Sequence, residues 1–257
     1  MLDILALQEL SKKAALEAGK EILKIYHSAD FGVEWKIDNS PLTLADKKGH
    51  ETIVQFLENT GLPILSEEGK QISYEIRRTW EAYWLIDPLD GTKEFMKRNG
   101  EFTVNIALMQ EGIPIMGVVY APVLDTLYWG SLQFGAFKQE KYKEPILLPF
   151  IKSDRIHSIV ASRSHISEET STFINLYPAV KSVNMGSSLK FMLIAEGTAQ
   201  IYPRFAPTME WDTAASQAIL EAAGGQVLTH KEGKRLKYNK ESLVNEWFVA
   251  HASSLYL

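Results

Sequence analysis

The chain contains no cysteine among its 257 residues, which excludes disulfide bonds, thiolate metal sites and a cysteine nucleophile. No apolar run reaches the length of a membrane-spanning helix. Residues 1–24 alternate apolar and charged side chains, where a signal peptide would be continuously apolar. We therefore expect a cytoplasmic protein without a transmembrane segment, and we leave a peripheral contact with the inner membrane open.

The chain also lacks an excess of positive charge. Its 27 lysines and arginines stand against 32 aspartates and glutamates, so the formal net charge is −5. Binding to a nucleic acid polymer needs a basic face, and this balance argues against such a partner. A small anionic ligand stays compatible with an acidic protein, provided that a bound cation or a local cluster of basic side chains offsets the repulsion.

The amino-acid composition is typical of a folded globular protein, with 46% hydrophobic and 23% charged residues. Apolar residues at helical spacing predict two amphipathic helices, over residues 3–27 and about 43–59. Short strands are predicted at 63–66 and 82–86. Residues 103–137 predict several antiparallel strands, because β-forming runs alternate there with glycine and proline.

Beyond residue 150 the pattern changes to strands that alternate with helices, as in layered α/β structure. We predict a strand at 156–161, a helix at 168–176, a strand at 182–185, a helix opened by Gly186-Ser187-Ser188, a strand at 199–202 and a helix at 213–223. The whole pattern indicates an α/β (α+β) protein in two parts, residues 1–150 and 151–257, that share one active-site cleft.

Acidic residues follow predicted strands or begin predicted helices at four places. These are Glu67 with its neighbour Glu68, Asp87, Asp90 and Asp212. Carboxylates that come from distant positions and meet at strand ends suit a hard divalent cation such as Mg²⁺, which prefers oxygen ligands. Pro88 fixes the backbone between Asp87 and Asp90, so a turn there would direct both carboxylates and the Leu89 carbonyl toward one centre.

Local chemistry offers a simpler explanation for the same residues. Aspartate, proline and glycine dominate solvated β-turns, so residues 87–92 taken alone are more often a turn than a site. Asp212 is equally well explained as the N-cap of a helix that begins at Thr213. The recurrence of acids at several strand ends and helix starts favours the functional interpretation.

The second half of the chain supplies positive charge. Gly186-Ser187-Ser188 precedes an apolar helix, whose first backbone N–H groups and dipole favour an anion. Lys190 lies one turn into that helix, and Arg204 ends a predicted strand with a guanidinium suited to phosphate. Arg163 and His165 form a third basic spot. Each of these residues, taken singly, is more often a surface residue than a ligand.

Three motifs occur along the chain in a fixed order. They are Leu65-Ser66-Glu67-Glu68, Trp84-Leu85-Ile86-Asp87-Pro88-Leu89-Asp90-Gly91-Thr92 and Trp211-Asp212-Thr213-Ala214-Ala215. Their order and spacing resemble those of the inositol monophosphatase superfamily over nearly the whole chain. Within it, the sequence is most similar to the 3′(2′),5′-bisphosphate nucleotidases of the CysQ type. Lys93-Glu94-Phe95 follows the central motif here, whereas inositol monophosphatases commonly carry Thr-Asn after Gly-Thr.

The resemblance implies a layered αβαβα sandwich and a lithium-sensitive phosphatase that uses two or three Mg²⁺ ions. By family role, the residues 1–150 carry most of the metal ligands, and the full set is Glu67, Asp87, the Leu89 carbonyl, Asp90 and Asp212. Asp46 matches the family's acidic residue that pairs with the motif threonine, here Thr92, to activate water. Its sequence context alone shows an ordinary acid in the first turn of a helix.

The substrate implied by the resemblance is adenosine 3′,5′-bisphosphate, a small phosphate ester of sulfur metabolism that would be hydrolysed to AMP and phosphate. The residues expected to contact it are Glu67, Leu89, Asp90, Gly91, Thr92, His165, Ser187, Ser188, Lys190, Arg204 and Asp212. The same chemistry on inositol monophosphate or a sugar bisphosphate is an alternative, which the substrate pocket decides. A catalytically silent nucleotide- or metal-sensing protein is a second alternative, although all expected ligand positions are filled. The oligomeric state stays open.

Overall fold

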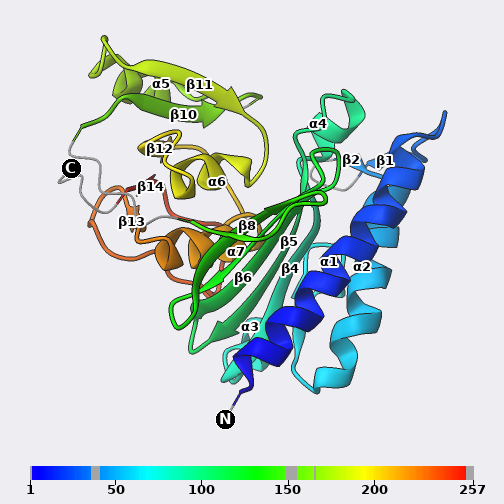
Figure 1. Cartoon of the computed structure of the whole chain (residues 1–257). Coiled ribbons are helices and arrows are strands. Elements are labelled where there is room, and N and C mark those ends of the chain that lie inside the picture. The colour runs from blue at the N-terminus through cyan, green and yellow to red at the C-terminus, as the bar shows by residue number, and fades with distance from the viewer. Residues whose placement is uncertain (1, 36–40, 149–154, 165, 253–257) are drawn as a thin grey trace.

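The structure is a computed structural model that describes residues 2–35, 41–148, 155–164 and 166–252. These residues form five layers: two helices, a seven-stranded sheet, two further helices, a five-stranded sheet and an outer helix (Figure 1). The expected αβαβα sandwich is confirmed. Within the described ranges, no helix is both long enough and apolar enough to cross a membrane.

The first layer is a pair of neighbouring helices, α1 (Ile4–Tyr26) and α2 (Leu44–Leu57), which confirm the two predicted amphipathic helices. The last turn expected for α2 is the separate 3₁₀ helix η1 (Glu58–Thr60). Thr43 caps α2 with its hydroxyl, which satisfies backbone N–H groups that the first helical turn leaves without partners. This cap matters for the site, because it fixes the start of α2 beside the central motif.

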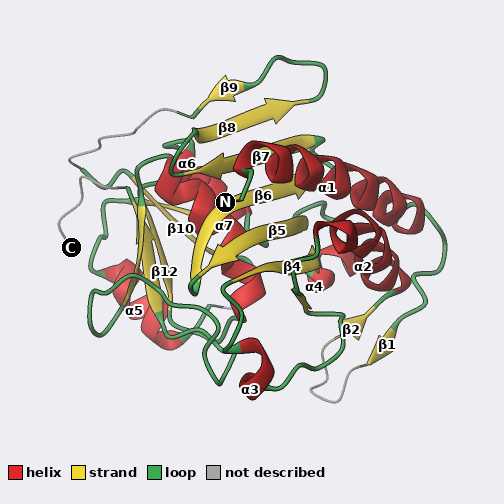
Figure 2. Cartoon of the chain, turned by 90° about the horizontal axis from the view of Figure 1, so that it is seen from below, coloured by secondary structure: helices red, strands yellow, loops and turns green. Residues whose placement is uncertain are grey.

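The second layer is a meander, in which only β3 and β4 run parallel. Its strands are β3 (Ile64–Ser66), β4 (Ala82–Asp90), β5 (Thr103–Gln110), β6 (Ile113–Ala121), β7 (Thr126–Ser131), β8 (Gly135–Glu140) and β9 (Ile146–Leu147). Figure 2 shows these strands in sequence order, with α1 and α2 on one face. Side chains alternate between the faces, so Trp84 and Ile86 pack toward α1 and α2 while Tyr83 and Leu85 enter the core on the other side.

The central motif differs from its prediction. We expected the strand to end at Asp87 and a turn to follow, but β4 continues to Asp90. Asp87 still pairs with Asn105 and Asp90 with Thr103, and the register shifts between them. Pro88 has no N–H for a regular ladder, so the chain forms a β-irregularity there rather than leaving the sheet.

The fourth layer is a sheet in the order β11-β10-β12-β14-β13. Its strands are β10 (Ser158–Ser162), β11 (Lys181–Met185), β12 (Ile201–Arg204), β13 (Gln226–Thr229) and β14 (Phe248–His251). The first three confirm predicted strands, whereas β13 and β14 have no counterpart among the predicted strands. Val160 faces the central helices and Ile159 faces the outer helix α5 (Glu168–Asn175), which also confirms its prediction.

The central layer consists of α6 (Leu189–Ala195) and α7 (Glu210–Ala222). Helix α7 packs on the seven-stranded sheet at close range: a Cβ added to Gly117 of β6 would lie 2.1 Å from the Ala215 carbonyl oxygen. The helix begins three residues earlier than predicted, so Asp212 is not its N-cap and lies inside the first turn. Met209 occupies the cap position.

Four short elements complete the described structure. They are β1 (Glu34–Trp35), β2 (Pro41–Leu42), α3 (Tyr74–Arg77) and α4 (Thr92–Met96). The two sheets separate near residue 150, but α7 comes from the second part of the chain and packs on the sheet of the first. The division into residues 1–150 and 151–257 therefore stays a prediction.

Candidate active site

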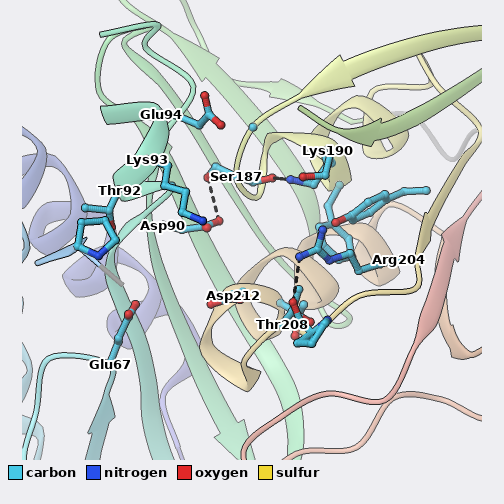
Figure 3. A pocket seen from close by; sticks show the side chains of 18 residues that line it. Glu67, Asp90, Thr92, Lys93, Glu94, Ser187, Lys190, Arg204, Thr208 and Asp212 are labelled. Carbon is cyan, nitrogen blue, oxygen red and sulfur yellow. Dashed lines mark hydrogen bonds between the residues drawn. The ribbon is translucent and has the colours of Figure 1, made fainter. Parts of the chain in front are cut away.

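A cavity of about 280 Å³ lies where the central motif, the loop before α6, the end of β12 and the start of α7 meet. Figure 3 shows Glu67, Asp90 and Asp212 on one side of it, with Lys93 beside Asp90, and Lys190 and Arg204 on the other side. The cavity therefore has an acidic end, formed by Glu67, Asp90 and Asp212, and a cationic end, formed by Lys190 and Arg204.

Most of the residues predicted for the site line this cavity. Those that do are Glu67, Asp90, Gly91, Thr92, Ser187, Lys190, Arg204 and Asp212. Asp46, Asp87, Leu89 and Ser188 are buried directly behind its wall. His165 lies outside the described residues, so its predicted contact with the substrate stays a prediction.

The acidic end is assembled by strand pairing. Glu67 directly follows β3, which runs parallel to β4, and its backbone N–H donates to the Ile86 carbonyl at 3.2 Å. This register brings Glu67 beside Asp87, which is only 2% exposed and accepts the backbone N–H of Leu89 on Oδ1 at 3.0 Å. Asp90 follows three residues later, and Asp212 arrives from the first turn of α7.

Asp90 is held by the loop before α6. Its Oδ2 accepts the Ser188 backbone N–H at 2.7 Å, the Ser187 hydroxyl at 2.8 Å and the Ser188 hydroxyl at 3.0 Å. The Asn105 side-chain amide donates to the same oxygen at 3.4 Å. All four donors use Oδ2, and Asp90 lines the cavity. The anion that this serine loop holds in the structure is thus the protein's own carboxylate, where we had expected a ligand.

The carboxylates of the acidic end repel one another. Burial raises the pKa of Asp87 well above its ordinary value, and the charges of Glu67 and Asp90 raise it further. Burial and the same two neighbours also raise the pKa of Asp212, although the Met209 N–H donates to its Oδ2 at 2.9 Å. A cluster of buried carboxylates that repel one another is stabilised either by binding protons or by binding a cation. Among the described residues, no group of three or more acidic or histidine side chains is placed closely enough to hold a metal ion.

Thr92 and Asp46 meet although 46 positions separate them. The Thr92 hydroxyl donates to Asp46 Oδ1 at 3.2 Å and lies 3.4 Å from the Leu89 carbonyl oxygen. Asp46 is 2% exposed, and its Oδ2 accepts the backbone N–H of Thr43 at 2.7 Å. The capping box of α2 therefore orients Asp46, which explains why its sequence context shows only a helix-start acid.

The cationic end holds two positive charges that are largely removed from water. Lys190 is 7% exposed and Arg204 is 8% exposed. Burial lowers the pKa of Lys190 to about 8, and Arg204 contributes to that lowering, while the nearby Asp90 opposes it. The Lys190 ammonium donates to the Ser187 carbonyl and lies 5.4 Å from the centre of the Tyr202 ring.

Several cavity residues were not selected from the sequence. Lys93, Glu94, Tyr202 and Thr208 all line the cavity. Lys93 and Glu94 directly follow the central motif, and this adjacency was the available signal. Tyr202 and Thr208 carried none, because each belongs to a motif-free stretch of the sequence and lines the cavity only in the folded chain. Arg163, predicted as a basic spot, instead forms an ion pair with Glu101.

The chain matches the inositol monophosphatase family over residues 5–255. A Buchnera aphidicola protein named 3′(2′),5′-bisphosphate nucleotidase CysQ is 46% identical over 93% of this chain and 91% of its own length. The Escherichia coli K12 protein of the same name is 44% identical over 91% of this chain and 95% of its own length. The crystal structure of CysQ from Bacteroides thetaiotaomicron superposes with a TM-score of 0.87 at 46% identity, over 96% of this chain and 97% of that one.

Proposed function

The chain belongs to the inositol monophosphatase family, and from this premise we propose that it is a 3′(2′),5′-bisphosphate nucleotidase that hydrolyses adenosine 3′,5′-bisphosphate to AMP and phosphate. Relatives that carry this activity in their names match it over more than nine-tenths of both chains. The protein would thus be a phosphoric monoester hydrolase, and the proposal extends to its substrate, its metal and the roles of individual residues.

One observation carries the choice of substrate: the acidic end and the cationic end belong to the same cavity. The acidic end would receive the phosphate that is cleaved, with the help of bound cations. A second phosphate on the same molecule needs its own positive charge, and Lys190 and Arg204 supply it at buried positions. A substrate with a single phosphate leaves this buried pair of cations unused.

The donor set fits Mg²⁺. It consists of oxygen atoms only, from Glu67, Asp87, the Leu89 carbonyl, Asp90 and Asp212, and Mg²⁺ keeps several waters in addition to a few carboxylates. The mutual repulsion that raises the pKa of Asp87 and Asp212 is relieved by a cation. When bound, two or three Mg²⁺ ions would lower the pKa of a water molecule and neutralise the scissile phosphate.

The chain's own groups would orient the reactants. Asp46 accepts a hydrogen bond from the Thr92 hydroxyl, which leaves the threonine oxygen free to accept one from a water molecule aligned for attack. Gly91 adopts a φ of 96°, a backbone conformation that favours glycine, and it lines the cavity together with Thr92 and Lys93, whose backbone N–H groups follow it. These N–H groups would bind the phosphate oxygens, and no covalent phosphoenzyme is required.

A phosphate-release assay with Mg²⁺ tests the proposal. Adenosine 3′,5′-bisphosphate, adenosine 3′-monophosphate and inositol monophosphate are compared on one preparation, and the bisphosphate should have the highest kcat/KM. A preference for inositol monophosphate would overturn the nucleotidase assignment. Lithium inhibition, implied by the family, is tested on the same preparation with matched LiCl and NaCl titrations, and equal rates in both salts would contradict it.

The variant Asp90→Asn tests the acidic end. It keeps an oxygen that can accept from Ser187 and Ser188 but removes the charge, so activity should fall by at least about 100-fold while the fold persists. Circular dichroism on the same sample separates loss of folding from loss of activity. Near-normal turnover at saturating Mg²⁺ would remove Asp90 from the proposed metal ligands.

A further inference from the structure

Three loops from different parts of the chain meet beside the cavity. They are the segment that follows α4, the residues that follow β10 and the loop that precedes α6. Their contacts centre on Glu101, Arg163 and Gly186, which we call the rim clamp. Glu101 and Arg163 have no role in the proposed chemistry, and Arg163 does not line the cavity.

The clamp is held by charge. The Arg163 side chain donates from Nε to Glu101 Oε2 at 2.6 Å and from Nη2 to Glu101 Oε1 at 2.7 Å. Glu101 Oε2 also accepts the backbone N–H of Gly186 at 2.8 Å. Arg163 Nη2 donates in addition to the Asn184 carbonyl at 2.9 Å. One carboxylate therefore ties the loop after β10 and the loop before α6 to the segment that follows the central motif.

The clamp is also held by close packing. A Cβ added to Gly186 would lie 2.6 Å from the Glu101 carbonyl oxygen and 2.9 Å from the Glu101 Cβ. A Cβ added to Gly91 would lie 3.2 Å from the same carbonyl oxygen and 3.3 Å from the Ser187 Cβ. The backbones touch directly, so a shift at Glu101 is transmitted to the loop before α6 and to the central motif.

A second tie lies next to the first. The Ser164 hydroxyl donates to Glu94 Oε1, and the Lys97 ammonium donates to the Ser164 oxygen at 2.8 Å. Glu94 is 4% exposed and lines the cavity. Glu94 of α4 and Glu101 of the segment that follows it thus hold two consecutive residues, Ser164 and Arg163.

The loop held by Glu101 serves both ends of the cavity. Ser187 and Ser188 donate three hydrogen bonds to Asp90 at the acidic end. The same loop leads into α6, where the Lys190 ammonium at the cationic end donates to the Ser187 carbonyl. The position of this loop therefore sets where Lys190 stands relative to Asp90.

We propose that Glu101, paired with Arg163, is a positioning residue that sets the separation between the acidic and cationic ends and thereby the preference for a substrate with two phosphates. The proposal rests on the proposed function. A substrate with one phosphate uses the acidic end alone and tolerates a change in this separation, whereas a bisphosphate must match both ends at once.

The variant Glu101→Gln tests the proposal, because the amide keeps the shape and an oxygen for the Gly186 N–H but loses the charge that pairs with Arg163. At saturating Mg²⁺, KM for adenosine 3′,5′-bisphosphate should rise about fivefold, with kcat within about twofold and KM for adenosine 3′-monophosphate within about twofold. Calorimetric titration of Mg²⁺ into the protein without substrate should show about threefold weaker binding, because Asp90 is held less firmly.

Arg163→Met serves as a second variant, which leaves Glu101 free to accept from Gly186. It should likewise raise KM for adenosine 3′,5′-bisphosphate and weaken Mg²⁺ binding. The double variant should show changes in KM and Mg²⁺ affinity no larger than those of the more affected single variant. Glu232→Gln is the matched control. Glu232 forms an exposed ion pair with Lys234, with an N–O distance of 2.7 Å, and neither residue lines the cavity. This control variant should change neither KM nor Mg²⁺ affinity.

Two results would overturn the inference: equal KM changes for both substrates in Glu101→Gln, or unchanged KM and Mg²⁺ binding in a variant whose unfolding temperature alone has fallen. Failure of the proposed function is a different observation. The wild-type protein would then show no preference for the bisphosphate, whatever the variants do.

Discussion

Arg204 provides the sharpest test of how the cavity distinguishes substrates. It is 8% exposed at the end of β12, and its Nη2 donates to the Pro207 carbonyl at 2.9 Å. Arg204 lines the cavity, and a guanidinium carries five N–H donors in a planar fork. Loss of a charge-assisted hydrogen bond costs about 1.5–3 kcal/mol, which corresponds to roughly 10- to 150-fold in affinity.

Arg204→Ala should therefore raise KM for adenosine 3′,5′-bisphosphate by roughly 10- to 150-fold and change KM for adenosine 3′-monophosphate by less than about threefold. Arg204→Lys is the control, because it keeps the charge but loses the planar pair of donors, and an intermediate KM is expected. Steady-state phosphate release at saturating Mg²⁺ measures both substrates. Circular dichroism checks the fold, since the Pro207 carbonyl loses a donor.

The same variant has a second consequence, at Lys190. Arg204 is one of the causes that lower the pKa of Lys190 to about 8, so its removal should move this pKa upward. The pH at which bisphosphate binding weakens should therefore rise in Arg204→Ala. Equal losses on both substrates would refute the assignment of Arg204 to the second phosphate and make it a structural residue. An unchanged pH profile would refute the electrostatic link to Lys190.

Two other outcomes are expected. The pKa of Lys190 is lowered from 10.5 to about 8, so its positive charge is present below that pH and lost above it. KM for the bisphosphate should therefore rise from about pH 8 upward, while KM for the monophosphate should not. Parallel pH profiles for the two substrates would contradict this. Gly117→Ala would place a Cβ 2.1 Å from the Ala215 carbonyl oxygen. The free energy of unfolding in a urea titration should therefore fall by about 1–3 kcal/mol. An unchanged midpoint would show that β6 and α7 can separate easily.

The sequence alone determined the local elements of this fold. Apolar spacing predicted α1 and α2, because burial on one helix face repeats with the helical period. The three motifs supplied the family and the candidate metal ligands. Strand-forming runs between glycine and proline predicted several antiparallel strands within residues 103–137. These are properties of neighbouring residues, and a linear pattern records them.

Only the tertiary structure decided which of these residues meet. Asp46 contacts Thr92 because the start of α2 is capped beside the end of β4; the family resemblance implied this pair, but the residues around neither position indicate it. Asp212 lies in the first turn of α7 rather than at its cap, since Met209 occupies that position. Ser187 and Ser188 hold Asp90, and Glu101 holds their loop, across about 85–100 positions of chain. Such contacts depend on how whole layers pack. The alternation of apolar residues in a strand shows which of its faces is buried, but it does not show which distant segment covers that face.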